Sequence, residues 1–382
     1  MKKELLIGIN GSMLDEQPSG VGVYSFNVIN NLSYSYSKTR QEKITVFTPT
    51  KLLLSKDVNI IKLSAFLQSS KYGKLAAFCR FLWNTFYYPL QAREFDLLIS
   101  PTTHGSFLLN NQVITIHDLL SLRFKNISFH QRVYFRYLLP YLVSKAKLII
   151  AVSETTKKDI IHFLKCPASK IAVIPNGYDT ARYFELREKT SVIQEVYGAS
   201  NYLLAVGPTY PHKNFERLLD AYSNLPEEIR QKFSLLIAGG KKKYESHLRE
   251  LVKKMTLEKH VRFLGYVPIE LMPSLYREAL ALVFPSLYEG FGIPLLEAMA
   301  CGCPVICSNT SSMPEVCNDA ALYFDPENTT DITSSMEAVI TNETLRSELK
   351  RKGLIQCSKF SWQQTAESLK YVIEKKFPTP NS

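Results

Sequence analysis

The chain has 382 residues, of which 46% are apolar and 21% charged, and its formal net charge is +11. This length allows two domains with a full core each, and the composition is that of a globular protein. No run of about 18 consecutive apolar residues is present, which argues against a membrane-spanning helix.

Short apolar runs in the first half alternate with helix-length segments, a pattern typical of parallel sheets covered by helices. The first run, Leu5–Ile9, is too short for the core of a signal peptide and predicts a strand in a cytoplasmic protein. Ser153 is expected to cap a helix that ends at Leu164, and Pro175-Asn-Gly177 forms a turn at the expected domain junction. Further strands are predicted at 44–47, 97–99, 113–116, 148–152 and 171–174.

Two places in the first half carry candidate ligand contacts. Gly20 and Gly22 lie between the first strand and a helix expected at 24–32, and they resemble part of a dinucleotide loop. His117 and Asp118 end a predicted strand, where ligands bind in α/β folds. The imidazole could also shuttle a proton, because histidine titrates near neutrality. A packed structural histidine is the alternative.

Two segments of the first half, 71–90 and 131–147, mix basic with aromatic side chains. Such a mixture suits a membrane interface, whereas two core-facing helices with basic rims are the alternative. Residues 1–180 hold 22 Lys and Arg against 11 Asp and Glu, while residues 181–382 hold 24 of each. This asymmetry favours an anionic partner, either nucleic acid or an acidic membrane, over a basic surface that only aids solubility.

The second half repeats the alternation and ends in an amphipathic helix at 362–375. Four of the seven cysteines cluster between Cys301 and Cys317 without the spacing of a zinc site, so buried thiols are expected, with neither a metal nor disulfides. Strands are predicted at 202–206, 234–238, 261–264, 279–284, 305–307 and 321–324, and helices at 214–225 and 244–255 among others.

Lys213 follows a predicted strand and the loop Gly207-Pro-Thr-Tyr-Pro-His212. It therefore lies at the carboxyl end of a sheet, where ligands bind in such folds. A lysine there can neutralise a diphosphate and stabilise it as it leaves. A solvated surface lysine at a helix start is the alternative.

The stretch Phe284-Pro-Ser-Leu-Tyr-Glu-Gly-Phe-Gly-Ile-Pro-Leu-Leu-Glu297 sets two carboxylates, Glu289 and Glu297, around a turn rich in glycine and proline. The strand before it and the helix after it, with Pro294 in the first turn, predict an anion site at a helix N-terminus. Carboxylates are poor neighbours for phosphate, so both are expected to accept hydrogen bonds from hydroxyls. Hydroxyls beside phosphates suggest a sugar nucleotide, and ordinary helix caps are the alternative.

This stretch resembles the donor-site motif of retaining glycosyltransferases of family 4. Further matches follow in the right order over nearly the whole chain: Gly20-Val-Gly-Val-Tyr24, Ile116-His-Asp118, Ala151-Val-Ser153, Ile174-Pro-Asn-Gly177, 206–214, 236–240, 261–267, 301–309, Met313-Pro-Glu-Val316 and Phe360-Ser-Trp362. The resemblance implies an α/β fold of two Rossmann-like domains facing across a cleft (GT-B). The acceptor domain would span 1–175 and the donor domain 176–361, with the C-terminal helix at 362–377 packing back on the first.

The resemblance also implies roles for the candidate residues. Lys213 would hold the diphosphate, Glu297 the ribose hydroxyls, and Glu289 the transferred sugar, which His117 would also contact. His212 stands where relatives often have arginine, which puts a second permanent positive charge on the phosphates in doubt. The implied catalytic set is His117, Lys213 and Glu289; the donor-binding set is Gly20, Gly22, Thr209, Lys213, Gly265, Gly290, Phe291, Gly292, Leu295 and Glu297; the acceptor side has His104 and Asp118.

The resemblance therefore implies a retaining glycosyltransferase that uses no metal and no cofactor. The form around Lys213 is most similar to bacterial mannosyltransferases of O-antigen, capsule or exopolysaccharide synthesis, so GDP-mannose is the expected donor, ahead of a UDP-hexose or dTDP-rhamnose. The expected acceptor is a growing, lipid-linked surface polysaccharide at the inner face of the membrane. A nucleotide-sugar epimerase, a catalytically silent subunit and a nucleic-acid-binding protein stay open, although no nucleic-acid recognition motif is present.

Overall fold

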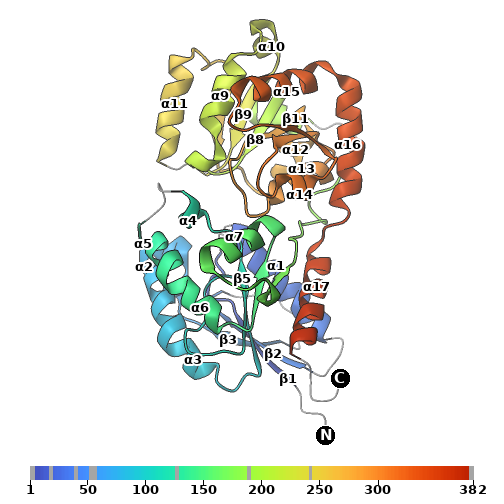
Figure 1. The fold of residues 1–382 in the computed structure, drawn as a ribbon. Helices are drawn as coiled ribbons and strands as arrows, with labels where there is room; N and C mark the ends of the chain where they lie inside the picture. Colours follow the sequence, from blue (N-terminus) through green and yellow to red (C-terminus); the bar gives the residue numbers. More distant parts are fainter. Residues whose placement is uncertain are drawn as a thin grey trace. The chain divides into compact units, whose positions relative to one another are not determined.

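The computed structural model describes residues 5–16, 20–37, 42–50, 58–124, 129–186, 191–240 and 243–377. The chain divides into two compact units: unit 1 comprises residues 1–177 and 362–382, and unit 2 comprises residues 178–361. Each unit contains one parallel sheet with helices packed around it (Figure 1). The α/β class predicted from the alternating apolar runs is confirmed.

Unit 1 has a seven-stranded sheet with the order β3-β2-β1-β4-β5-β6-β7. Six strands lie within two residues of their predicted positions, but the prediction missed β3. Three of the five residues in this edge strand are exposed, so it lacks the continuous apolar run of a buried parallel strand. The strands are β1 (Leu5–Asn10), β2 (Glu42–Thr48), β3 (Val58–Lys62), β4 (Leu97–Ser100), β5 (Gln112–Ile116), β6 (Leu148–Ala151) and β7 (Ile171–Val173).

The helices of unit 1 include two π-helical segments, η2 and η3, and each is followed closely by a proline, Pro89 or Pro140. Proline lacks the N–H that continues an α-helix, which accounts for the local change in winding. The helices are α1 (Gly20–Ser37), η1 (Ala65–Leu67), α2 (Ser69–Leu82), η2 (Trp83–Tyr87), α3 (Tyr88–Gln91), α4 (Leu120–Arg123), α5 (Phe129–Val133), η3 (Tyr134–Leu138), α6 (Leu139–Lys145), α7 (Glu154–Leu164), η4 (Ala168–Lys170) and α17 (Trp362–Lys376).

The start of α1 differs from the predicted loop at Gly20 and Gly22. Gly20 and Gly22 lie within the first turns of this helix rather than in a loop before it, and the helix continues to Ser37. Neither glycine has a positive φ, so both adopt helical backbone that other residues can also adopt. A glycine pair is a weak loop signal, because each glycine costs a helix only about 1 kcal/mol.

The last helix, α17, returns to unit 1 and packs against α1. Its Thr365 hydroxyl donates to the Pro175 carbonyl (2.8 Å), and the rings of Trp362 and Tyr24 lie 5.8 Å apart between centroids. A bilayer-spanning helix is not found anywhere in the described ranges of the chain.

Unit 2 has a six-stranded sheet with the order β10-β9-β8-β11-β12-β13, and all six strands were predicted. The strands are β8 (Tyr202–Val206), β9 (Ser234–Ala238), β10 (Val261–Gly265), β11 (Ala281–Phe284), β12 (Val305–Ser308) and β13 (Ala321–Phe324). The helices are α8 (Val192–Tyr197), η5 (Pro211–Lys213), α9 (Phe215–Ser223), α10 (Glu227–Lys232), α11 (Tyr244–Lys254), α12 (Met272–Arg277), α13 (Ile293–Ala300), α14 (Met313–Cys317), α15 (Thr329–Thr341) and α16 (Glu343–Cys357).

In both sheets the strand order reverses at one place, between β1 and β4 in unit 1 and between β8 and β11 in unit 2. The connections on the two sides of such a reversal leave a crevice at the carboxyl ends of the strands, and ligands bind there in open α/β sheets. The loops after β8 and β11 are therefore the first place to look for a site in unit 2.

Candidate active site

Each loop at the strand-order reversal of unit 2 carries one charged candidate residue. Lys213 ends the 3₁₀ turn η5 after β8, and Glu289 lies in the loop after β11. The Lys213 Nζ lies 2.5 Å from Glu289 Oε1, and both side chains are largely buried. The fold thus brings these two residues together as an ion pair at the position where α/β sheets bind ligands.

Hydrogen bonds to backbone carbonyls hold the two loops against each other. The Leu287 N–H donates to the His212 carbonyl (2.8 Å), and Asn214 Nδ2 donates to the carbonyls of Pro285 (3.1 Å) and Pro326 (2.7 Å). Asn214 has φ +60°, a left-handed conformation that asparagine adopts more readily than most residues. These contacts fix the end of η5 relative to the end of β11.

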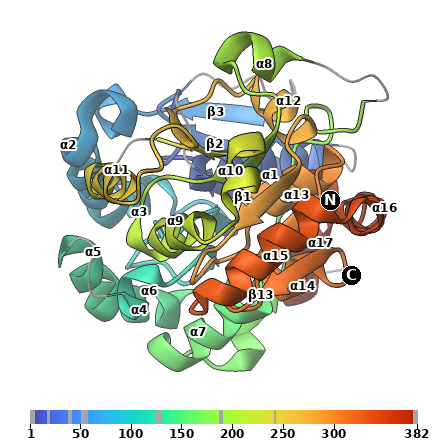
Figure 2. The ribbon, with the colours of Figure 1, turned by 90° about the horizontal axis from the view of Figure 1, so that it is seen from above.

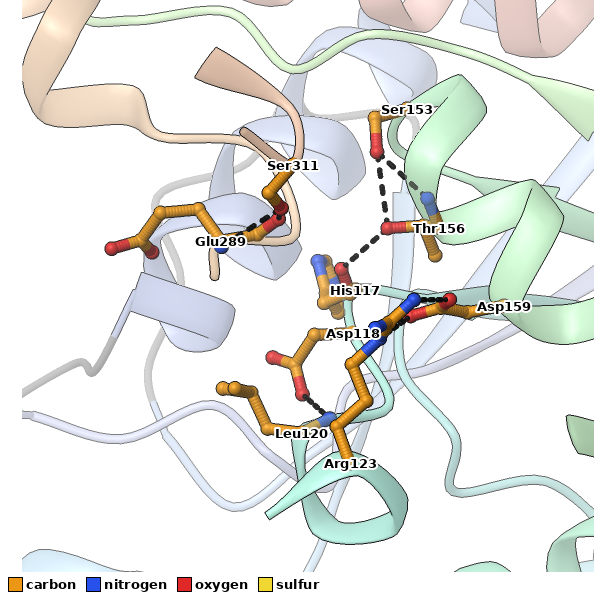
Figure 3. Close-up of polar contacts among 9 residues, drawn as sticks. All are labelled: His117, Asp118, Leu120, Arg123, Ser153, Thr156, Asp159, Glu289 and Ser311. Atoms are coloured by element: carbon orange, nitrogen blue, oxygen red, sulfur yellow. Dashed lines mark hydrogen bonds and ion pairs between the residues drawn. The ribbon is translucent and has the colours of Figure 1, made fainter. Parts of the chain in front are cut away.

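Two serines hold the backbone around Glu289 in place, and Figure 3 shows one of them, Ser311. The Glu289 N–H donates to Ser311 Oγ (3.1 Å), and the Ser311 hydroxyl donates to the Glu289 carbonyl (2.6 Å). The Ser312 hydroxyl donates to the Phe291 carbonyl (2.8 Å). Neither serine was predicted from the sequence, although a signal was present: Asn309-Thr-Ser-Ser312 follows β12 at the same edge of the sheet.

The glycine-rich turn leads into α13. Gly290 and Phe291 continue the loop, and Gly292 has φ +103°; a Cβ there would lie 2.9 Å from Leu295 Cδ1, so this position favours glycine. The Leu295 N–H donates to the Gly292 carbonyl (3.0 Å). Leu295 was predicted among the donor-binding residues; in the structure its N–H closes the first turn of the helix.

Glu297 lies on α13, where two tyrosines provide its hydrogen bonds. The Tyr276 hydroxyl donates to Glu297 Oε2 at 2.9 Å, and Tyr183 also hydrogen-bonds to this carboxylate. Burial raises the pKa of Glu297 to about 7, and the tyrosine hydrogen bonds oppose part of that shift. In the structure the hydroxyls that bind this carboxylate are those of two tyrosines, and its contact with ribose hydroxyls stays a prediction.

The raised pKa of Glu297 predicts how stability changes with pH. The pKa lies above its ordinary value of 4.5, so the folded state binds more protons than the unfolded state between these two values. Relative to Glu297→Gln, the wild type should lose roughly 2–3 kcal/mol of unfolding free energy between pH 4.5 and pH 7 and stay level above that. Urea unfolding across this range measures the difference.

The control is Glu337→Gln, which changes an exposed carboxylate on α15. Its stability should follow the wild type at every pH. A Glu297→Gln profile parallel to the wild type would contradict the raised pKa.

Two other donor-side candidates lie at the carboxyl ends of strands in the same sheet. Thr209 is buried in the loop after β8, and Gly265 ends β10 with φ +68°. The His212 ring stacks on Tyr210 (5.6 Å between centroids). Burial, together with the neighbouring Lys213, lowers the pKa of His212 to about 4. His212 is therefore neutral at pH 7 and does not supply a second permanent positive charge.

His117 lies at the carboxyl end of β5 in unit 1, as predicted, but it does not titrate near neutrality. Its Nε2 lies 2.9 Å from the Pro101 carbonyl, so this nitrogen carries the proton, and its ring meets Tyr24 edge-on at 4.5 Å. Burial lowers the pKa of His117 to about 4. The expectation of a proton shuttle at neutral pH is therefore wrong, because desolvation favours the neutral imidazole.

Figure 3 shows the contacts made by His117 and by the short segment that follows it. Asp118 Oδ1 accepts the Leu120 N–H (3.1 Å), and the Thr156 hydroxyl donates to the His117 carbonyl (3.2 Å). Arg123 forms an ion pair with Asp159, with Nε 2.8 Å from Oδ2. Asp118 thus has a local structural contact in addition to its predicted acceptor-side role.

His104, the other acceptor-side candidate, belongs to the loop after β4. Its Nδ1 lies 3.1 Å from the Thr102 hydroxyl, and its ring stacks on Tyr134 at 6.4 Å. Burial lowers the pKa of His104 to about 4, and the nearby Arg80 contributes.

The burial predicted for the four clustered cysteines is confirmed. All seven are free thiols, and Cys301, Cys303, Cys307 and Cys317 are buried. Within the described ranges, no three His, Cys, Asp or Glu side chains gather as metal ligands do.

The chain is similar to known proteins over most of its length. The O-antigen chain mannosyltransferase B of Escherichia coli is 30% identical over 90% of this chain and 93% of its own length. The O-antigen chain mannosyltransferase RfbU of Salmonella typhimurium is 35% identical over 66% of this chain and 67% of its own length. Anabaena HepE, crystallised in complex with UDP-glucose, shares the fold with a TM-score of 0.73 at 17% identity, over 97% of this chain and 100% of that chain.

Two family descriptions match consecutive parts of the chain. Residues 19–182 match the family described as "Glycosyltransferase Family 4", and residues 187–355 match the one described as "Glycosyl transferases group 1". With full-length similarity to the Escherichia coli enzyme, the chain belongs to glycosyltransferase family 4 and is a glycosyltransferase.

Proposed function

We propose that this glycosyltransferase transfers mannose from GDP-mannose to a growing bacterial surface glycan of the O-antigen type. Both relatives described above are mannosyltransferases of O-antigen chains. The observation that carries the proposal is the Lys213–Glu289 pair at the strand-order reversal of unit 2. The acceptor in this proposal is lipid-linked and lies at the inner face of the membrane.

The pair is suited to exchange partners when a donor binds. Lys213 Nζ can turn from Glu289 to the diphosphate and stabilise the negative charge that grows on it as the glycosidic bond breaks. Glu289 can then accept hydrogen bonds from hydroxyls of the sugar and stabilise the positive charge that develops at its anomeric carbon. Because Lys213 supplies a resident cation, we infer that the diphosphate requires no metal.

The remaining residues position the donor. In this proposal Glu297 holds the ribose hydroxyls, and Gly290, Phe291 and Gly292 offer backbone N–H groups to the sugar. The leaving phosphate oxygen takes the proton of the acceptor hydroxyl, on the same face of the sugar as the new bond forms. This route retains the anomeric configuration and needs no separate protein base.

A panel of donors tests the proposal. GDP-mannose, UDP-glucose and dTDP-rhamnose are each offered with octyl α-mannoside as the acceptor probe, and nucleotide release and the product linkage are measured. GDP release that requires the acceptor, with an α-linked mannosyl product, is expected. Turnover with UDP-glucose or dTDP-rhamnose alone would overturn the mannose assignment, and isomerisation of the donor without acceptor would indicate an epimerase.

Binding is measured in parallel by thermal unfolding. GDP at about 100 times its dissociation constant should add about 2.7 kcal/mol to the free energy of unfolding. UDP and dTDP at the same concentration should add less. A protein that none of the three nucleotides stabilises would be a catalytically silent member of the family.

A further inference from the structure

Large apolar side chains are exposed on two helical segments of unit 1. On α2, η2 and α3 the most exposed are Phe78 (58%), Phe86 (59%), Tyr87 (64%) and Leu90 (58%). On η3 and α6 they are Tyr137 (66%) and Tyr141 (50%). Aromatic rings left in water forgo the free energy of burial, so a group of them on one surface marks an interaction site. The full set, called the aromatic face below, is Tyr72, Leu75, Phe78, Phe86, Tyr87, Leu90, Val133, Tyr137 and Tyr141.

The two segments belong to one continuous surface. The Phe107 ring, in the loop after β4, lies 6.3 Å from the Phe81 ring of α2 and 6.3 Å from the Tyr141 ring of α6. The Tyr134 hydroxyl of η3 donates to the Thr103 carbonyl of the same loop (2.7 Å). Figures 1 and 2 both show α2, α3, α5 and α6 on the same side of unit 1.

The charge on these segments has a single sign. Residues 71–93 contain four Lys or Arg and no Asp or Glu, and residues 129–147 contain the same numbers. Some of these basic residues have contacts within the protein: Arg80 is buried, Lys71 pairs with Glu16, and Lys147 Nζ lies 4.5 Å from the Phe377 ring. Lys74 lies one helical turn from Phe78, and Lys145 Nζ lies 5.4 Å from the Tyr141 ring. Positive charges therefore accompany the exposed rings.

We propose that the aromatic face binds the surface of an anionic lipid bilayer. Aromatic rings prefer the depth of the headgroups, where one edge is apolar and the other hydrated. Lys and Arg reach the lipid phosphates while their alkyl stems cover apolar surface, and each adds to the attraction. This inference concerns where the enzyme works and does not depend on the sugar that it transfers.

Vesicle flotation without any substrate tests the proposal directly. The wild type should float with vesicles of phosphatidylcholine containing about 30% phosphatidylglycerol and remain unbound with phosphatidylcholine alone. Binding to the mixed vesicles should weaken with added salt, because the electrostatic part is screened. Equal binding to both kinds of vesicle, or binding to neither, would overturn the proposal.

Two pairs of variants separate the apolar from the electrostatic contribution. Tyr87→Ser/Tyr137→Ser should lower the affinity for mixed vesicles at least about tenfold, and Lys74→Glu/Arg136→Glu should lower it at least about 25-fold, since each basic residue is worth roughly fivefold. Tyr371→Ser on α17 is the matched aromatic control, because Tyr371 is 65% exposed on another helix. Lys253→Glu/Lys254→Glu on α11 is the matched charge control, and neither control should change vesicle binding.

Two further measurements distinguish a membrane-binding surface from a protein interface and from a defect in catalysis. All variants should keep the wild-type melting temperature and the wild-type rate with octyl α-mannoside, which needs no bilayer. If Tyr87→Ser/Tyr137→Ser changed the oligomeric state in solution and left vesicle binding intact, the aromatic face would be a protein interface and the proposal would be wrong. Loss of transfer with intact vesicle binding would instead count against the proposed reaction alone.

Discussion

Replacing Lys213 by alanine is expected to lower the rate of sugar transfer by about 10²–10³-fold, the usual effect of removing one preorganised group that stabilises charge in the transition state. Lys213 Nζ is the cation at the strand-order reversal and is already held 2.5 Å from Glu289. The measurement is kcat and KM with the accepted donor, together with the thermal shift caused by the free nucleotide diphosphate. Lys232→Ala, an exposed lysine on α10, should behave as the wild type.

Lys213→Ala also leaves the largely buried Glu289 without its cation. Its effect on stability must therefore be measured separately from its effect on activity. Removing one partner of a buried pair is usually more destabilising than removing both. The double variant Lys213→Ala/Glu289→Ala should therefore regain stability relative to Lys213→Ala while activity stays low. If Lys213→Ala kept its activity within tenfold of the wild type, the assigned role of this lysine would be wrong.

Replacing Gly239 by alanine is expected to cost at least about 3 kcal/mol of unfolding free energy. Gly239 follows β9 with φ +154°, and a Cβ there would lie 2.0 Å from the Gly207 carbonyl oxygen. The Cβ would clash with backbone atoms, which cannot move away by a rotamer change as side-chain atoms can. The melting temperature of unit 2 should fall by roughly 6–12 °C.

The neighbouring residue supplies the control for that change. Gly240 has open space around its Cβ position and no positive φ, so Gly240→Ala should leave the melting temperature within about a degree. Equal effects at Gly239 and Gly240 would contradict the packing argument. Because Gly207 precedes the loop of Lys213, partial folding of Gly239→Ala should also weaken nucleotide binding.

The sheets could be predicted because each buried parallel strand is a short apolar run between helix-length segments. Three strands of unit 2, Tyr202–Val206, Ser234–Ala238 and Ala321–Phe324, have their predicted bounds. The edge strand Val58–Lys62 could not be found this way, because an edge strand needs only one neighbour and its residues remain exposed.

The sequence predicted which loops contain the site, but not how their side chains contact one another. Strand ends pointed to Lys213, Glu289 and His117, but their mutual contacts depend on side-chain geometry between residues far apart in the chain. The Lys213–Glu289 pair joins positions 76 residues apart. The lowered pKa of His117 could not be predicted from the sequence either. Desolvation depends on neighbours such as Tyr24, which only folding brings close to the ring.

The return of α17 to unit 1 has a consequence for synthesis on the ribosome. The Trp362 ring packs against Tyr24, which in turn meets the His117 ring, so a late-made segment completes the surroundings of an early-made residue. At roughly 5–20 residues per second, the ribosome needs on the order of ten seconds or more to make unit 2 in between. During that interval the nascent unit 1 carries an uncovered face on α1. Unit 2 is one unbroken stretch and can fold as it emerges, so the first part of the chain to be made is the last to be finished.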